Sequence, residues 1–120
     1  IPAGLRRAID PAKVWLINHN HNALKPKAIT TIRYNIWWPN CPADFTDVSN
    51  FKGYRDMVGK KAILMHELCH VVQYKTGRLS VSKYLTSPKD WKYGYKFDAN
   101  KPFEQYRIEE QGDIVRDWYL

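Results

Sequence analysis

The sequence has little of what disulfide-rich or membrane-spanning domains depend on. Cysteine occurs only twice in 120 residues, which is too few for a disulfide framework. We expect Cys41 and Cys69 to be unpaired thiols, with Cys69 packed as a small apolar residue. No apolar run approaches the roughly 20 residues that span a bilayer, so no membrane insertion is expected. The first residues also lack the apolar block of a signal peptide.

The residues that are present indicate one folded domain. Hydrophobic residues make up 44% of the chain and aromatic residues 14%, a composition typical of globular rather than disordered proteins. We therefore expect a single domain over residues 1–120. Because the chain begins without Met and its last helical pattern runs up to Leu120, we expect the C-terminal module of a longer protein, or a processed product.

Positive charge exceeds negative charge, with 19 Lys and Arg against 12 Asp and Glu and a formal net charge of +7. The basic residues are scattered and form no continuous stripe, so we interpret them mainly as a solvated surface. Attraction to an anionic cell-wall polymer is the alternative. Nucleic acid is not expected as a partner, and we expect a monomer.

Two strands and two helices can be placed from the pattern. Residues 14–17 form an apolar run typical of a buried strand, and residues 31–38 alternate as a half-buried strand does, with Thr31 on the polar side. Helical spacing covers residues 58–76, with Gly77 as the stop, and residues 102–118. We expect residues 78–100 to be irregular. These elements predict an α+β fold with a short antiparallel or mixed sheet.

The first helix carries the motif "HELCH". Placing successive residues about 100° apart puts His66 and His70 within about 40° of each other, opposite the apolar arc of the helix. Two imidazoles one turn apart can share a tetrahedral Zn²⁺, and Glu67 flanks the pair where a general base would stand. The alternatives are a metal-free buried pair and a purely structural zinc.

A hydrolytic zinc needs a third protein ligand, and no histidine follows His70. On the last helix Glu109 and Asp113 lie within about 40° of each other, again opposite an apolar arc. We predict Glu109 as the ligand and Asp113 as the acceptor of the outer N–H of a ligating histidine. Glu110 is the alternative ligand, and a solvated acidic face is the interpretation without metal.

A second cluster, "NHNHN", holds His19 and His21 after the first predicted strand. Either histidine could fold back as a ligand, or the pair could serve a basic nuclease. A polar turn after a strand explains the cluster without any chemistry.

These motifs resemble a known family. The segments "NALKPKAITTIRYNIWWPNCPADFT", "LMHELCHVVQYKTG" and "KPFEQYRIEEQGDIVRDWY" together are similar to the zincin metallopeptidase domains at the C-termini of VgrG and Rhs proteins of bacterial type VI secretion. The resemblance implies a small zincin-like fold in which an edge strand, here residues 31–38, lies above the active-site helix and pairs with a peptide substrate. It further implies a toxin or effector delivered into a target cell, acting in the periplasm rather than the cytoplasm, and an immunity protein.

The predicted reaction is zinc-dependent amide hydrolysis, with His66, His70 and Glu109 as ligands and Glu67 as the base. The substrate is a protein or peptide, or alternatively the peptide cross-link of peptidoglycan. The rival from another class is a non-catalytic binding module in which zinc only joins helices. The donor that stabilises the oxyanion stays open among several candidates: Tyr84, Tyr93, Tyr95, Tyr106 and Arg116, of which Tyr106 is predicted to share the ligand-bearing face of the last helix.

Overall fold

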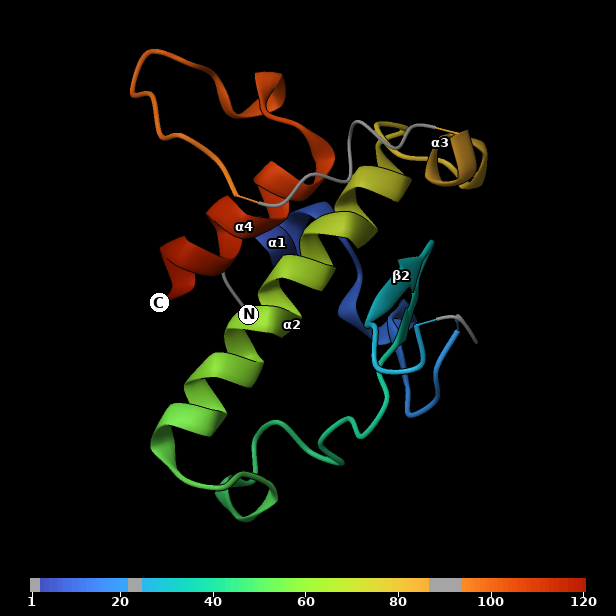
Figure 1. Cartoon of the computed structure of the whole chain (residues 1–120), viewed down its shortest axis with the longest axis vertical. Helices are drawn as coiled ribbons and strands as arrows, with labels where there is room; N and C mark the ends of the chain where they lie inside the picture. Colours follow the sequence, from blue (N-terminus) through green and yellow to red (C-terminus); the bar gives the residue numbers. More distant parts are fainter. Residues whose placement is uncertain (1–2, 22–24, 87–93) are drawn as a thin grey trace.

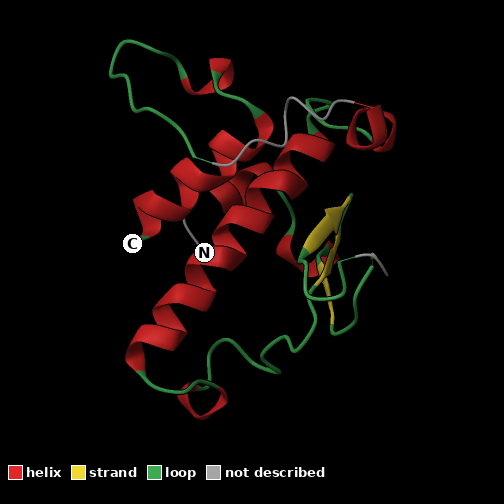
Figure 2. Cartoon of the chain, viewed as in Figure 1, coloured by secondary structure: helices red, strands yellow, loops and turns green. Residues whose placement is uncertain are grey.

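The computed structural model describes residues 3–21, 25–86 and 94–120. Its long helix α2 (Tyr54–Lys75) runs through the molecule, with strand β2 (Thr30–Ile32) to one side and helix α4 (Ile108–Tyr119) to the other (Figure 1). Helices predominate, and the strands form one small sheet (Figure 2). The predicted α+β class is therefore confirmed. No helix within the described ranges is both long and apolar enough to cross a bilayer.

The sheet has three strands in the order β1-β3-β2, where β1 is Trp15–Ile17 and β3 is Asn35–Trp37. Strand β1 pairs parallel to β3, and β2 pairs antiparallel to it. The sheet is thus mixed, as predicted. Strand β2 is an outer strand that packs against α2, so an edge strand does lie over the helix that carries the "HELCH" motif.

The single strand predicted over residues 31–38 is wrong. Those residues form a hairpin, because Arg33 adopts a left-handed conformation with φ 55° and reverses the chain between β2 and β3. Thr31 pairs directly with Ile36, so both side chains point to the same face of the sheet. Thr31 is consequently buried, although its place in the alternation predicted a polar face.

The first strand forms where it was predicted, but it is not buried. Trp15 is 66% exposed and Leu16 is 39% exposed. The reason is that β1 occupies an outer position of the sheet rather than a central one, and an apolar run alone does not distinguish the two positions.

The helices differ from their predicted bounds at their starts. Helix α2 begins at Tyr54 instead of about residue 58, directly after Gly53, which has a φ of 115°. Its end agrees with the prediction, because Gly77 follows with a φ of 79°. A short helix, α3 (Val81–Thr86), occupies part of the segment predicted to be irregular.

The last helix begins at Ile108 and not near residue 102. A turn of 3-10 helix, η4 (Phe103–Gln105), precedes it, and Tyr106 and Arg107 have extended backbones. The predicted place of Tyr106 on the helix is therefore wrong. Pro102 starts the 3-10 turn rather than the α-helix.

The core lies between the sheet and α2. Helix α1 (Ala3–Ala8) also packs on α2. The buried cluster consists of Ile9, Ile36, Trp38, Met65, Leu68 and Val71. Full burial of such a side chain stabilises the fold by about 1.5–3 kcal/mol, so this cluster fixes α2 against the sheet and determines which face of α2 is left for α4.

Candidate metal centre

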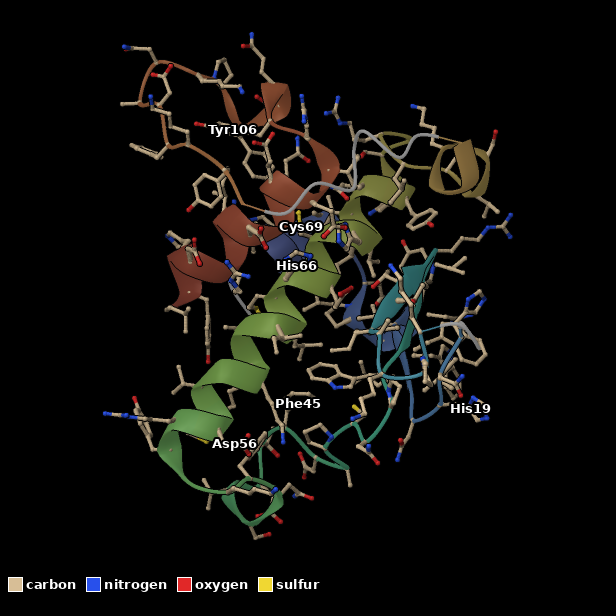
Figure 3. All side chains as sticks on the ribbon, in the orientation of Figure 1. His19, Phe45, Asp56, His66, Cys69 and Tyr106 are labelled. Carbon is tan, nitrogen blue, oxygen red and sulfur yellow. The ribbon has the colours of Figure 1, made fainter. Side chains whose placement is uncertain are left out.

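The face of α2 opposite the core carries the two histidines of "HELCH". His66 is 7% exposed and His70 is 5% exposed, because α4 packs over them. Figure 3 shows His66 near the middle of α2. The polar face predicted from the helical wheel is thus not solvated but enclosed between two helices.

Three side chains converge in this space. The Nε2 atoms of His66 and His70 lie 3.0 Å apart. The Glu109 carboxylate of α4 faces both, with Oε2 at 3.1 Å from His66 Nε2 and Oε1 at 2.9 Å from His70 Nε2. The structure therefore brings together the three residues predicted as ligands, and Glu109 is itself buried.

The arrangement suits a small cation. Zinc bonds to nitrogen and oxygen at about 2.0–2.2 Å, which places neighbouring ligand atoms of a tetrahedral site about 3.3 Å apart. The two Nε2 atoms are 3.0 Å apart, and each lies 2.9–3.1 Å from a different carboxylate oxygen of Glu109, so these separations are close to that value. Two imidazole nitrogens that face each other at 3.0 Å also require a proton or a cation between them. The residues thus fit a zinc ion by donor type and by spacing.

The protonation of the site reflects the opposing effects of burial and charge. Burial alone would lower the pKa of His70, but its hydrogen bond to Glu109 and the charges of Glu67 and Glu109 outweigh burial and raise the pKa to about 9. Burial likewise would raise the pKa of Glu109, yet the hydrogen bonds and charges of the two histidines lower it to about 2. Glu109 is therefore an anion throughout the physiological range.

Glu67 stands beside this group and is held by a different element. Its Oε2 accepts a hydrogen bond of 2.7 Å from Thr31 Oγ1 of β2. Ligand atoms of Glu67, His66 and His70 lie within 4.8 Å of one another, so Glu67 is near the site, but Glu109 is the carboxylate in direct contact with both rings. Burial raises the pKa of Glu67, although the two histidines and Thr31 oppose the shift.

The structure separates Glu109 from its neighbour Glu110. Glu110 Oε1 accepts a 2.8 Å hydrogen bond from the Arg107 backbone N–H, which caps the start of α4. Its carboxylate is thus used at the helix terminus, whereas Glu109 points to the histidines. Glu110, the alternative ligand, is therefore bound to the Arg107 backbone.

Asp113 lies one turn after Glu109, behind His66. Its Oδ1 is 3.1 Å from His66 Nδ1 and 3.0 Å from Arg116 Nη1. Neither contact is aligned as a hydrogen bond, and the contact with Arg116 is an ion pair. Asp113 Oδ2 accepts a hydrogen bond of 3.0 Å from the Gly94 backbone N–H. Asp113 thus lies beside the outer nitrogen of His66, but the predicted hydrogen bond from that nitrogen is not formed.

Sequence reasoning missed Gly112, which lies between the two acidic residues of α4. A Cβ at this position would lie 2.7 Å from Cε1 and 2.8 Å from Nε2 of His66. Only glycine therefore lets α4 approach the His66 ring this closely. A glycine in the interior of a helical pattern was the available signal, because such a glycine costs about 1 kcal/mol relative to alanine unless packing requires it.

Gly112→Ala should displace His66 and thereby weaken zinc binding by at least about tenfold, with a loss of about 1–3 kcal/mol in the free energy of unfolding. The matched control is Gly59→Ala in α2, where a Cβ meets nothing within 4 Å. That variant should keep its zinc affinity and gain up to about 1 kcal/mol of stability. Chelator competition and thermal unfolding measure both quantities, and equal zinc affinities of the two variants would contradict this role of Gly112.

A cleft of about 290 Å³ opens onto the site. Its polar wall contains His66, Glu67 and Asp113, and its cationic residues are Lys27 and Arg116. The apolar part of the lining comes from Ala28, Ile29 and Ile63. The cleft therefore reaches Glu67 and one side of His66, whereas His70 and Glu109 do not line it.

The remaining candidate residues lie elsewhere. The Tyr106 hydroxyl donates to the Asp98 carbonyl at 3.2 Å and accepts from the Asp98 N–H at 3.0 Å, so it is used inside the segment before α4. His19 bonds to the Asn20 carbonyl, and Figure 3 shows His19 at the margin of the molecule, away from His66. His21 packs on Trp37 with the ring centroids 5.3 Å apart.

The other oxyanion candidates and the cysteines can also be placed. Tyr95 donates to Asp117 Oδ2 at 2.8 Å. Tyr93 and the side chain of Tyr84 lie outside the described residues. Cys41 and Cys69 are both unpaired, and burial raises the pKa of the Cys69 thiol to about 12, so it packs as an apolar residue.

Comparisons with known proteins give one informative similarity. The chain is 35% identical over 66 residues to the type VI secretion system spike protein VgrG2b of Pseudomonas aeruginosa PAO1. The match covers 51% of this chain but only 6% of that much longer protein. No family model matches the chain, and no solved structure matches it. The similarity supports the predicted relation to type VI secretion, while the peptidase part of the resemblance stays a prediction.

Proposed function

We propose that this chain is a zinc-dependent amide hydrolase that acts as an effector domain in type VI secretion. One observation carries the proposal: a buried carboxylate, Glu67, is held by Thr31 at the wall of an open cleft, beside a cluster of two histidines and Glu109. His66, His70 and Glu109 would hold the metal. Bound zinc supplies Lewis-acid chemistry, which acidifies water and polarises a carbonyl.

The residues of the chain account for the proton transfers. Glu67 accepts the proton of the attacking water and passes it to the leaving amine. The Thr31 hydroxyl holds one carboxylate oxygen of Glu67, which leaves the other oxygen to take the proton. Arg116 is the oxyanion candidate that lines the same cleft as Glu67 in the described part of the chain, and we propose that its positive charge stabilises the oxyanion.

The similarity to a spike protein favours delivery into a target cell, with the periplasm as the proposed place of action and an immunity protein as the partner of the producing cell. Incubating zinc-loaded protein with an unfolded protein and, separately, with purified peptidoglycan distinguishes the two substrates. We expect new amino termini from the unfolded protein. Cleavage of peptidoglycan alone would reassign the substrate, and cleavage of neither would contradict the hydrolase proposal.

Zinc affinity should rise with pH at values below about 9. The pKa of His70 is raised from 6.5 to about 9 in the protein without metal, and a histidine must be neutral to bind zinc. Zinc therefore displaces a proton from His70 over this range, which increases the affinity by up to about tenfold for each pH unit. Competition with a chelator of known affinity at several pH values measures the slope, and a flat profile would contradict the ligand role of His70.

A further inference from the structure

Two buried glutamines connect the helices behind the metal centre. Gln73 of α2 and Gln111 of α4 are each 3% exposed. Gln73 Nε2 donates to Gln111 Oε1 at 2.8 Å and to the Ile108 carbonyl at 3.0 Å. Gln111 Nε2 donates to the carbonyls of Phe103 and Tyr106 at 3.0 and 3.2 Å. The two amides thus form a chain that ends on backbone carbonyls of the segment before α4.

Those carbonyls fix the orientation of both amides. A backbone carbonyl only accepts hydrogen bonds, so each amide must turn its NH₂ group toward the carbonyls and its oxygen away from them. For Gln111 the oxygen then faces Gln73, and for Gln73 the oxygen faces His70. An inverted Gln73 amide would place its oxygen against the Ile108 carbonyl and against Gln111 Oε1, leaving buried acceptors without donors.

The Gln73 end of this hydrogen-bonded pair of amides contacts the metal centre. Gln73 Oε1 lies 2.7 Å from His70 Nδ1. Because this oxygen can only accept, Nδ1 must carry a hydrogen and donate it. The neutral His70 ring then has its lone pair on Nε2, the atom that faces Glu109 and His66.

We propose that Gln73, oriented by Gln111, is a positioning residue that fixes the hydrogen of His70 on Nδ1 and thereby presents Nε2 to the zinc. This inference rests on the proposed zinc site. In this arrangement, backbone carbonyls at residues 103, 106 and 108 determine which nitrogen of His70 can bind metal. An outer hydrogen bond of this kind contributes about 10–100-fold to metal affinity.

The alternative is that Gln73 only clamps α2 to α4, and two variants distinguish the roles. Gln73→Met removes both the acceptor for His70 and the hydrogen bonds donated to α4. Gln73→Glu loses the donated bonds and also places an oxygen against the Ile108 carbonyl, but it keeps an acceptor for His70 Nδ1. Positioning predicts that Gln73→Met binds zinc about 10–100-fold more weakly than wild type, whereas Gln73→Glu stays within about threefold. Clamping alone predicts the same loss in both.

Chelator competition gives the affinities, and ¹⁵N–¹H NMR of the zinc-loaded wild-type protein shows which ring nitrogen of His70 carries hydrogen. We expect hydrogen on Nδ1. Equal losses in the two variants, an unchanged affinity of Gln73→Met, or hydrogen on Nε2 would each overturn the inference while the zinc site itself stands. Absence of zinc binding by the wild-type protein would instead overturn the proposed function and this inference with it.

Discussion

Glu67→Gln is expected to bind zinc like the wild-type protein and to hydrolyse its substrate about 10²–10⁴-fold more slowly, the typical contribution of a general base. The amide has the shape of the carboxylate and can still accept the hydrogen bond that Thr31 donates to Glu67. It cannot take a proton from water, so only the chemical step is lost. Initial rates at saturating substrate, together with zinc affinity from chelator competition, measure both halves of the prediction.

The matched control for this variant is Glu104→Gln, the same chemical change at an exposed position of η4. It should leave both zinc affinity and hydrolysis unchanged. If Glu67→Gln retained more than about a tenth of the wild-type rate, Glu67 would not be the base. If it instead lost its zinc, the carboxylate would be a ligand, and the roles of Glu67 and Glu109 would have to be exchanged.

Glu109→Gln should weaken zinc binding by at least about 100-fold, because loss of a direct ligand costs more than the 10–100-fold typical of residues that only support one. The substitution keeps the size of the side chain but removes the negative charge that faces both histidine rings. Hydrolysis should fall in proportion to bound zinc at a limiting zinc concentration. Excess zinc should recover part of the activity.

Glu110→Gln is the control for this second variant, since it makes the same change one residue along α4. Glutamine accepts the Arg107 N–H as glutamate does, so the helix cap is retained. Its zinc affinity should match that of the wild-type protein. An equal loss of zinc affinity in Glu110→Gln and Glu109→Gln would show that the total negative charge at the start of α4 attracts the cation. Glu109 would then not be a specific ligand.

The convergence of α2 and α4 could be predicted because it rests on local periodicity. His66 and His70 lie one turn apart on one helix, and Glu109 and Asp113 do so on the other, and in each case the apolar residues define the opposite face. The sequence favoured Glu109 over its alternative Glu110 only through Asp113, which lies one turn after Glu109. That choice depends on the first turn of α4, where the Glu110 side chain caps the helix.

The residues that support the site were not predictable in the same way. Thr31 reaches Glu67 only because the chain reverses at Arg33, and the alternation of apolar residues continues unbroken through that turn. Gln73 donates to the Ile108 carbonyl, which is 35 residues away in the sequence, a separation that no periodicity reports. Such contacts are set by tertiary packing, which local sequence patterns do not determine.

Tyr106 and Trp118 show two things that a helical wheel does not determine: where the helix begins and how deeply its residues are buried. The predicted helix began near residue 102, so Tyr106 was placed on its ligand-bearing face, but α4 begins at Ile108 and Tyr106 bonds to Asp98 instead. Trp118 lies about 180° from Glu109 on the helical wheel, on the apolar side of the helix, yet it is 69% exposed. Position on a helical wheel fixes direction only, and burial depends on how far the neighbouring elements extend.

The most direct test of the metal centre is an anomalous difference map, measured at the zinc absorption edge, from crystals of the zinc-loaded protein. The predicted result is one peak at about 2.0–2.2 Å from Nε2 of His66, Nε2 of His70 and a carboxylate oxygen of Glu109, with no fourth protein atom at that distance. A peak enclosed by four protein atoms, a peak at other residues, or no peak between α2 and α4 would contradict the account.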